Sequence, residues 1–143
     1  MCRAKTCWCA MANEAVVARA RALLGTRFRF QGQTPDGVDC VGLVALACGV
    51  RQVPDDYGWR GDVAGWIAQI NARLIPRGAA AEAGDILAFH PGPATLHLGI
   101  WSGTGLIHAH ASLRRVVETP GLPDWPQLGC WCPPKEDIWQ HWS

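Results

Sequence analysis

Cys40 is the residue of this sequence whose type and position best suit chemistry. It lies in residues 39–44, DCVGLV, which open a stretch so apolar that it predicts a buried helix over residues 39–47, ended by Gly49. A cysteine in the first turn of a helix faces unpaired backbone N–H groups and the positive end of the helix dipole. Both favour the thiolate, which is the nucleophilic form. Cys48, near the negative end of the same helix, is interpreted as an inert core residue, and without a partner Cys40 also fits that interpretation.

A thiol nucleophile needs a base and a third group that orients the base. His97 lies in a strand-like run at residues 96–101, while His108 and His110 share one face of the next such run at residues 106–110. A hairpin between the runs makes them neighbours, so we expect His97 and His108 to meet across two strands. Two histidines on adjacent strands, beside a cysteine at a helix start, favour a Cys-His-His site over isolated structural residues.

The elements that would position these side chains change in type along the chain. Before Pro76 the apolar residues recur at helical spacing, and after it they alternate as in strands. Asn13 and Asp62 are expected helix caps, and residues 26–38 and 50–61 read as irregular. The predicted helices are 14–24, 39–47 and 62–73, and the predicted strands are 85–89, 96–101, 106–110 and 116–118. Helices followed by a strand meander indicate an α+β fold with the helices packed on an antiparallel sheet.

The bulk properties describe one globular domain, expected over residues 11–143. Of the 143 residues, 49% are hydrophobic and 17% are charged, and the net charge of +1 excludes a nucleic-acid partner that needs a concentrated basic face. No apolar run is long enough for a membrane span, and the N-terminus does not resemble a signal peptide. Residues 1–10 are expected to be an extension or a disordered tail, and residues 120–143 an irregular surface segment.

The terminal cysteines form a second cluster of potential interest. Cys7 and Cys9 flank one tryptophan, and Cys130 and Cys132 flank another, in a chain with an odd total of 7 cysteines. Zinc is disfavoured because structural sites space paired cysteines by two to four residues rather than one. A disulfide between the termini is a second alternative. Unconnected thiols are the default expectation.

Several short motifs also occur in a characteristic order. They are residues 25–30 (GTRFRF), 39–44 (DCVGLV), 84–89 (GDILAF), 97–100 (HLGI) and 106–109 (LIHA). The ordered set resembles NlpC/P60 cysteine peptidases over about residues 14–118, and it is most similar to the small branch encoded in prophages and tail-gene clusters. The resemblance implies a papain-like α+β core, in which N-terminal helices pack on a five- or six-stranded antiparallel sheet.

The resemblance also implies an activity and roles for particular residues. Members hydrolyse the bond between D-glutamate and diaminopimelate or lysine in peptidoglycan stem peptides. By position, Cys40 is the nucleophile, His97 the base and His108 the orienting residue, with His110 as an alternative for the third role. A thiolate–imidazolium pair of Cys40 and His97 is expected to start the reaction, with no cofactor or metal.

Three further positions are carried over as substrate-binding residues. Asp39 matches the family acid that helps hold the free amine of the stem peptide, and it also fits a helix N-cap. Phe28 stands where the family often has a tyrosine, so the hydroxyl near the oxyanion is missing and backbone N–H groups must replace it. Val41 replaces the family's usual serine, which narrows or dries the adjoining subsite.

The expected partners are peptidoglycan stem peptides and phage-like tail proteins, with no nucleic acid and no membrane span. A virion or phage-like tail is the expected location, acting in the periplasm or cell wall. Two alternatives stay open. One is an inactive tail-assembly or murein-binding module on the same scaffold, and the other is an amidase or acyltransferase that uses the same triad.

Overall fold

The computed structural model describes residues 4–49, 63–78 and 80–133. The described residues form the helices α1 (Ala4–Ala22), α2 (Cys40–Ala47) and α3 (Val63–Arg73). The strands are β1 (Gln33–Thr34), β2 (Gly37–Val38), β3 (Ile75–Pro76), β4 (Ile86–Phe89), β5 (His97–Trp101), β6 (Gly105–His110), β7 (Arg115–Pro120) and β8 (Gln127–Cys132). The helices precede most of the strands, as the change of period near Pro76 predicts.

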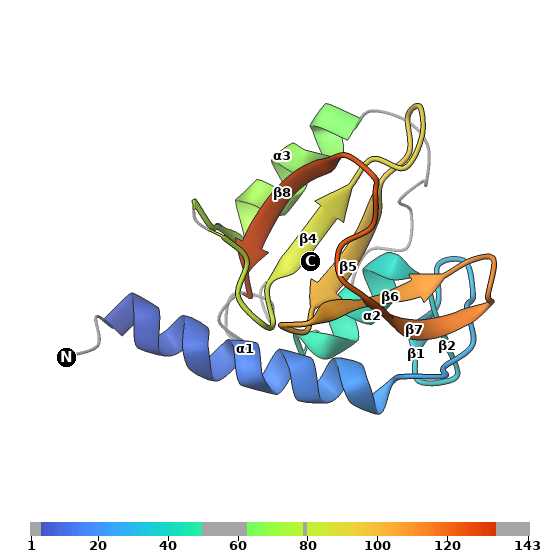
Figure 1. Cartoon of the computed structure of the whole chain (residues 1–143), viewed down its shortest axis with the longest axis horizontal. Helices are drawn as coiled ribbons and strands as arrows, with labels where there is room; N and C mark the ends of the chain where they lie inside the picture. Colours follow the sequence, from blue (N-terminus) through green and yellow to red (C-terminus); the bar gives the residue numbers. More distant parts are fainter. Residues whose placement is uncertain (1–3, 50–62, 79, 134–143) are drawn as a thin grey trace.

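One antiparallel sheet of 6 strands organises the fold, in the order β3-β8-β4-β5-β6-β7. Strands β4 to β7 follow one another as a meander, and β8 returns to lie between β3 and β4 (Figure 1). The strands β1 and β2 form a separate small hairpin. The predicted α+β class, with helices packed on an antiparallel sheet, is therefore confirmed.

Helix α2 is the central helix because it is apolar on nearly every side. It packs against α1 on one side and against β5 and β6 on the other, and most of its residues are buried. Side chains from one face of the sheet complete this core, among them Ile86, Ala88, Leu98, Ile100, Ile107 and Ala109. The opposite face carries a smaller cluster built on Leu87, Phe89 and Leu106, against which Trp101 and Trp125 pack. The alternation of side chains along each strand produces both clusters.

Four sequence predictions about local structure are wrong. Helix α1 begins at Ala4, so residues 4–10 are helical, which contradicts the disordered tail but not the extension. Asn13 lies inside the helix instead of capping it. Residues 127–132 form β8, inside the sheet and not in an irregular surface segment. The hairpin β1–β2 occupies part of the stretch predicted as loop. Residues 127–132 lack a clear period, so only their pairing with the distant strands β3 and β4 defines this strand.

Two expectations fall outside the described residues: the irregular stretch 50–61 and the Asp62 cap of α3. Among the helices that the structure describes, none combines the length and apolar character needed to cross a membrane.

Candidate active site

Asp39 holds the start of α2 and places Cys40 in its first turn. Its Oδ1 accepts a hydrogen bond from the backbone N–H of Gly42 at 2.8 Å, as expected for an N-cap. Its Oδ2 accepts a second one from the backbone N–H of Gln31, also at 2.8 Å. The carboxylate is fully buried, so these backbone donors compensate much of its desolvation. Asp39 therefore joins the loop before β1 to the helix that carries Cys40.

Gly42 allows this loop to lie directly on α2. A Cβ atom at Gly42 would overlap the carbonyl oxygen of Gly32. The same carbonyl accepts a hydrogen bond from the backbone N–H of Asp39 at 3.3 Å. The glycine is thus required by close contact between two backbones, two residues from Cys40.

The start of α2 reaches the sheet where two strands separate. The ladder between β5 and β6 pairs only Ile100 with Ile107 and Trp101 with Leu106. Toward His97 the ladder stops, and the backbone N–H of Leu98 comes close enough to the sulfur of Cys40 to lower its pKa. Cys40 therefore lies beside the peptide unit that follows His97, although no hydrogen bond joins Cys40 to His97 in the described part of the chain.

The predicted meeting of His97 and His108 is confirmed. Nε2 of His97 lies 2.8 Å from Nδ1 of His108, and the rings are nearly perpendicular, at 81°. Nε2 of His108 lies 3.3 Å from the hydroxyl of Thr119 on β7. His110 does not take this place, because its Nδ1 accepts from the backbone N–H of Leu113 and its ring centre lies 5.4 Å from that of His108. Strands β7, β6 and β5 thus carry a chain of polar contacts that leads from Thr119 through His108 to His97.

Trp125 covers the histidine pair, and sequence reasoning missed it. Its ring meets that of His97 edge-on at 5.2 Å and that of His108 at 6.3 Å, and it also contacts Phe89. The residue belongs to the segment that was expected to be irregular surface. It lies in the connection that leads from β7 to β8, so the position of β8 in the sheet brings Trp125 to the site. A tryptophan two residues before a strand carries no sequence signal for this role.

Burial dominates the protonation of the site. Desolvation, with a smaller contribution from the charge of Asp39, raises the pKa of the Cys40 thiol from 9.0 to about 12. Burial, and then the neighbouring histidines, lower the pKa of His97 from 6.5 to about 3 and that of His108 to about 4. The expected thiolate–imidazolium pair is therefore not the favoured resting form. The helix dipole is outweighed because a charge is costly at a buried position.

The residues expected to bind substrate lie around the start of α2. Phe28 and Val41 are half-buried and pack against the main core, and Phe28 forms an isolated bridge with Val38. Asp39 is engaged by backbone groups, as an N-cap should be. The backbone N–H groups of Cys40 and Val41 lie beside the Cys40 sulfur, where they lower its pKa. Backbone N–H groups next to a nucleophile are the kind of donor that can stabilise an oxyanion.

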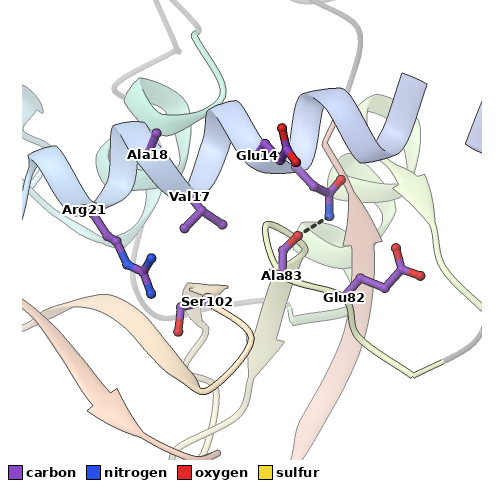
Figure 2. A pocket seen from close by; sticks show the side chains of 8 residues that line it. Glu14, Val17, Ala18, Arg21, Glu82, Ala83 and Ser102 are labelled. Carbon is purple, nitrogen blue, oxygen red and sulfur yellow. Dashed lines mark hydrogen bonds between the residues drawn. The ribbon is translucent and has the colours of Figure 1, made fainter. Parts of the chain in front are cut away.

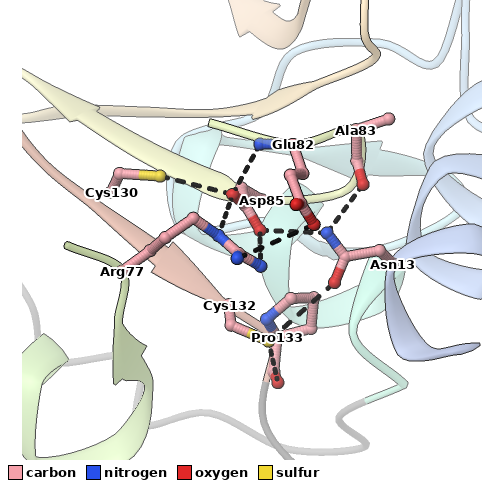
Figure 3. Close-up of polar contacts among 8 residues, drawn as sticks. All are labelled: Asn13, Arg77, Glu82, Ala83, Asp85, Cys130, Cys132 and Pro133. Atoms are coloured by element: carbon pink, nitrogen blue, oxygen red, sulfur yellow. Dashed lines mark hydrogen bonds and ion pairs between the residues drawn. The ribbon is translucent and has the colours of Figure 1, made fainter. Parts of the chain in front are cut away.

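A second polar cluster, at the other end of the sheet, is built on Asp85. Its buried carboxylate pairs with Arg77 and accepts hydrogen bonds from Asn13 at 2.9 Å, from the Glu82 backbone at 2.8 Å and from Cys130 at 3.5 Å (Figure 3). Asn13 therefore binds the Asp85 carboxylate instead of capping a helix. The cluster joins α1, β8 and the turn before β4.

Cys132 lies beside this cluster and is bonded in a disulfide. The default of unconnected terminal thiols is therefore wrong for Cys132, while Cys130 is a free thiol. Among the described residues, no group of three His, Cys, Asp or Glu side chains is arranged to hold a metal ion.

A cavity of about 530 Å³ separates α1 from the turn after β5. Figure 2 shows Val17 and Arg21 on the helix facing Ser102 and Ala83. Ser102 follows the end of β5 opposite His97, roughly 17 Å away along the strand. Arg21 is paired with Glu118 at 3.3 Å. The cavity is therefore separate from Cys40 and the histidines.

Comparison with known proteins identifies a family and related proteins. Residues 25–127 match the model of the NlpC/P60 family. The chain is 26% identical over 102 residues to the murein DD-endopeptidase MepS/murein LD-carboxypeptidase of Escherichia coli, covering 71% of this chain and 51% of that protein. The chain thus spans about half the length of this curated relative.

Solved structures show the same fold. The peptidoglycan hydrolase RipB of Mycobacterium tuberculosis matches with a TM-score of 0.60 at 26% identity, over 92% of this chain and 67% of that one. NlpC2 of Trichomonas vaginalis matches with a TM-score of 0.65 at 21% identity, over 87% of this chain and 47% of that one. The family match covers most of the chain and includes Cys40, His97 and His108. This chain belongs to the NlpC/P60 family.

Proposed function

We propose that this protein is a cysteine peptidase that hydrolyses peptide bonds in the stem peptides of peptidoglycan. The main support is that the sulfur of Cys40 lies beside the backbone N–H of Leu98, next to His97, whose ring is hydrogen-bonded to that of His108. The proposed nucleophile thus lies beside the backbone of the strand that carries the proposed base, and the proposed orienting residue is hydrogen-bonded to that base. The substrate class is supported by family membership and by relatives that are named peptidoglycan hydrolases or a murein endopeptidase.

The proposed reaction starts from a neutral thiol and a neutral imidazole. As the Cys40 sulfur attacks the carbonyl carbon, His97 accepts the thiol proton, and backbone N–H groups at the start of α2 stabilise the oxyanion. The C–N bond then breaks and His97 gives its proton to the leaving amine. Water attacks the thioester with His97 again as the base, which releases the carboxylic acid and restores the thiol. His108 holds the ring of His97 in both steps.

The bond that we propose joins D-glutamate to diaminopimelate or lysine. The support is the resemblance of residues 39–44 and 97–100 to the family motifs. Asp39 is proposed to help hold the free amine of the stem peptide, and Phe28 and Val41 to line the adjoining subsites. The name of the Escherichia coli relative describes other bonds, so DD- and LD-linked fragments are the competing substrates.

Purified protein and its Cys40→Ala variant should be incubated with defined muropeptides, and the products identified by mass spectrometry. Cys48→Ala is the matched control, because Cys48 is equally buried at the other end of α2. We expect cleavage between D-glutamate and the next residue by the wild type and by Cys48→Ala, and none by Cys40→Ala. Cleavage that survives in Cys40→Ala would reject the proposed nucleophile. Cleavage only of DD- or LD-linked fragments would reject the proposed bond.

A binding module without catalysis is the second candidate. It is favoured by the missing hydroxyl at Phe28 and by the high pKa of the Cys40 thiol. In the same assay it predicts tight binding of muropeptides with no turnover by any variant. Turnover of other amides or esters, dependent on Cys40, would instead identify an amidase or acyltransferase.

We also propose that the protein reaches the cell wall as part of a phage-like tail. The support is the resemblance of its motifs to the small tail-encoded branch of the family. Mass spectrometry of purified tail particles should detect the protein, and its absence from such particles would reject this route.

A further inference from the structure

We infer that Thr119 is a positioning residue that selects the tautomer of the His97–His108 pair in which the lone pair of His97 Nδ1 is available to Cys40. The significance for catalysis rests on the proposed function, while the tautomer itself does not. Thr119 lies outside the family motifs seen in the sequence. It lies on β7, directly opposite Leu106 of β6 in the register of the sheet.

The hydroxyl of Thr119 has two neighbours with different capacities. One is the backbone carbonyl of Leu106, 3.5 Å away, which can only accept a hydrogen bond. The other is Nε2 of His108, 3.3 Å away, which donates or accepts according to the tautomer. Since the hydroxyl has one proton, donation to Leu106 leaves its oxygen to accept from His108.

The direction of the hydrogen bond between Thr119 and His108 determines which nitrogen is protonated in each ring. A neutral imidazole has one N–H, so if Nε2 of His108 donates to Thr119, Nδ1 of His108 must be an acceptor. His97 then donates from Nε2 to Nδ1 of His108, across 2.8 Å. The single proton of His97 is thus on Nε2, and its Nδ1 carries a lone pair.

The opposite arrangement would disable the base. If Thr119 donated to His108, the proton of His108 would lie on Nδ1 and point at Nε2 of His97. His97 would then carry its proton on Nδ1, the nitrogen that faces away from His108, and that nitrogen could not accept the thiol proton. The carbonyl of Leu106 opposes this arrangement because it would lose its contact with the hydroxyl.

Burial strengthens the selection. His97 is 9% exposed and His108 is 3% exposed, and the ring of Trp125 packs against both. With little water to replace a lost partner, a proton on the wrong nitrogen leaves buried polar atoms unpaired. The Thr119 hydroxyl contacts His108 and not His97, yet it can determine which nitrogen of His97 is protonated.

The test replaces the hydroxyl while keeping the shape of the side chain. Thr119→Val removes it, Thr119→Ser keeps it, and Thr104→Val removes a hydroxyl from the exposed turn between β5 and β6 as a control. Two-dimensional ¹H–¹⁵N NMR that detects the imidazole nitrogens should report the tautomer of each ring. We expect Nε2–H on both rings in the wild type, in Thr119→Ser and in Thr104→Val, and mixed or inverted tautomers in Thr119→Val.

Activity provides the second measurement. We expect kcat/KM on the muropeptide to fall about 10-fold in Thr119→Val, as for other partners that orient a reacting histidine, and to recover in Thr119→Ser. Thermal melting should show that each variant is folded, and Thr119→Ala serves the same test if valine disturbs β7. Unchanged tautomers in Thr119→Val would overturn the inference. A tautomer change in a protein that cuts no muropeptide would support the inference and reject the proposed function alone.

Discussion

His97 and His108 share a hydrogen bond of 2.8 Å between Nε2 of the first and Nδ1 of the second. Each ring therefore uses one nitrogen for this hydrogen bond, and its second nitrogen remains for a different partner. For His108 that partner is Thr119, and for His97 we propose Cys40. Both rings are buried and neither pKa favours a charge, so the proposed site at rest holds a neutral thiol and neutral imidazoles.

Cys40 should react slowly with alkylating agents at neutral pH. Because burial raises the pKa of its thiol to about 12, little thiolate exists there. The alkylation rate, measured at the Cys40 peptide by mass spectrometry, should rise steadily with pH and show no plateau between pH 5 and 9 (about the range in which preformed thiolates react at a constant rate). A plateau in this range would indicate the thiolate–imidazolium pair instead.

The acid limb of the activity profile should lie at low pH. The base must be neutral, and the pKa of His97 is lowered from 6.5 to about 3 and that of His108 to about 4. A lowered pKa means that protonation, and the loss of activity, occur only as the pH falls well below 6.5. We expect kcat/KM on a muropeptide to be nearly constant from about pH 7 to about pH 5. A midpoint near the ordinary histidine value would contradict the burial of the base.

Removal of the Trp125 ring should raise the pKa of His97. The ring lies 5.2 Å from that of His97, and its loss would admit water to a group whose pKa is lowered mainly by burial. In Trp125→Leu we expect the midpoint for His97, followed by NMR, to move upward toward 6.5. Leu122→Ala, at an exposed position of the same connection, should leave the midpoint unchanged. Equal midpoints in both variants would show that Trp125 does not shield the pair.

Loss of the Asp85 carboxylate should destabilise the whole domain. Asp85 is fully buried and pairs with Arg77, whose side chain is only 17% exposed, so Asp85→Ala would leave a nearly buried cation without its partner. We expect the free energy of unfolding in urea to fall by about 3 kcal/mol. Glu82→Gln changes an ion pair whose acid is 66% exposed, and should cost less than about 0.5 kcal/mol. Similar losses in the two variants would contradict the importance of burial here.

Gly42→Ala should disturb the nucleophile and the fold together. Its new Cβ would overlap the Gly32 carbonyl, which forces the loop away from α2. We expect a loss of about 2 kcal/mol in the free energy of unfolding. The loop shift should also lower kcat/KM, because the same loop reaches Asp39 beside Cys40. Gly78→Ala, where a Cβ meets no atom within 4 Å, is the matched control. If Gly42→Ala kept the wild-type stability, the close contact between Gly42 and the Gly32 carbonyl would be refuted.

Local patterns in the sequence predict several elements of the fold and part of the site. The apolar stretch around residues 39–47 predicts the buried helix, and Asp39 before it predicts the cap. Alternation predicts β4 to β7, and with the turn between β5 and β6 it predicts that His97 and His108 meet. Each of these features depends on residues close together in the chain, or on two strands joined by a short turn.

Tertiary structure decided the features that depend on distant partners. The segment before β8 has no period, so only its pairing beside β4 brings Trp125 onto the histidines. Asn13 resembles a cap in the sequence, yet it binds Asp85 from 72 positions away. The helix dipole predicts a lowered pKa for the Cys40 thiol, whereas burial raises this pKa. The dipole is a property of one helix, whereas burial is set by every element packed around the sulfur.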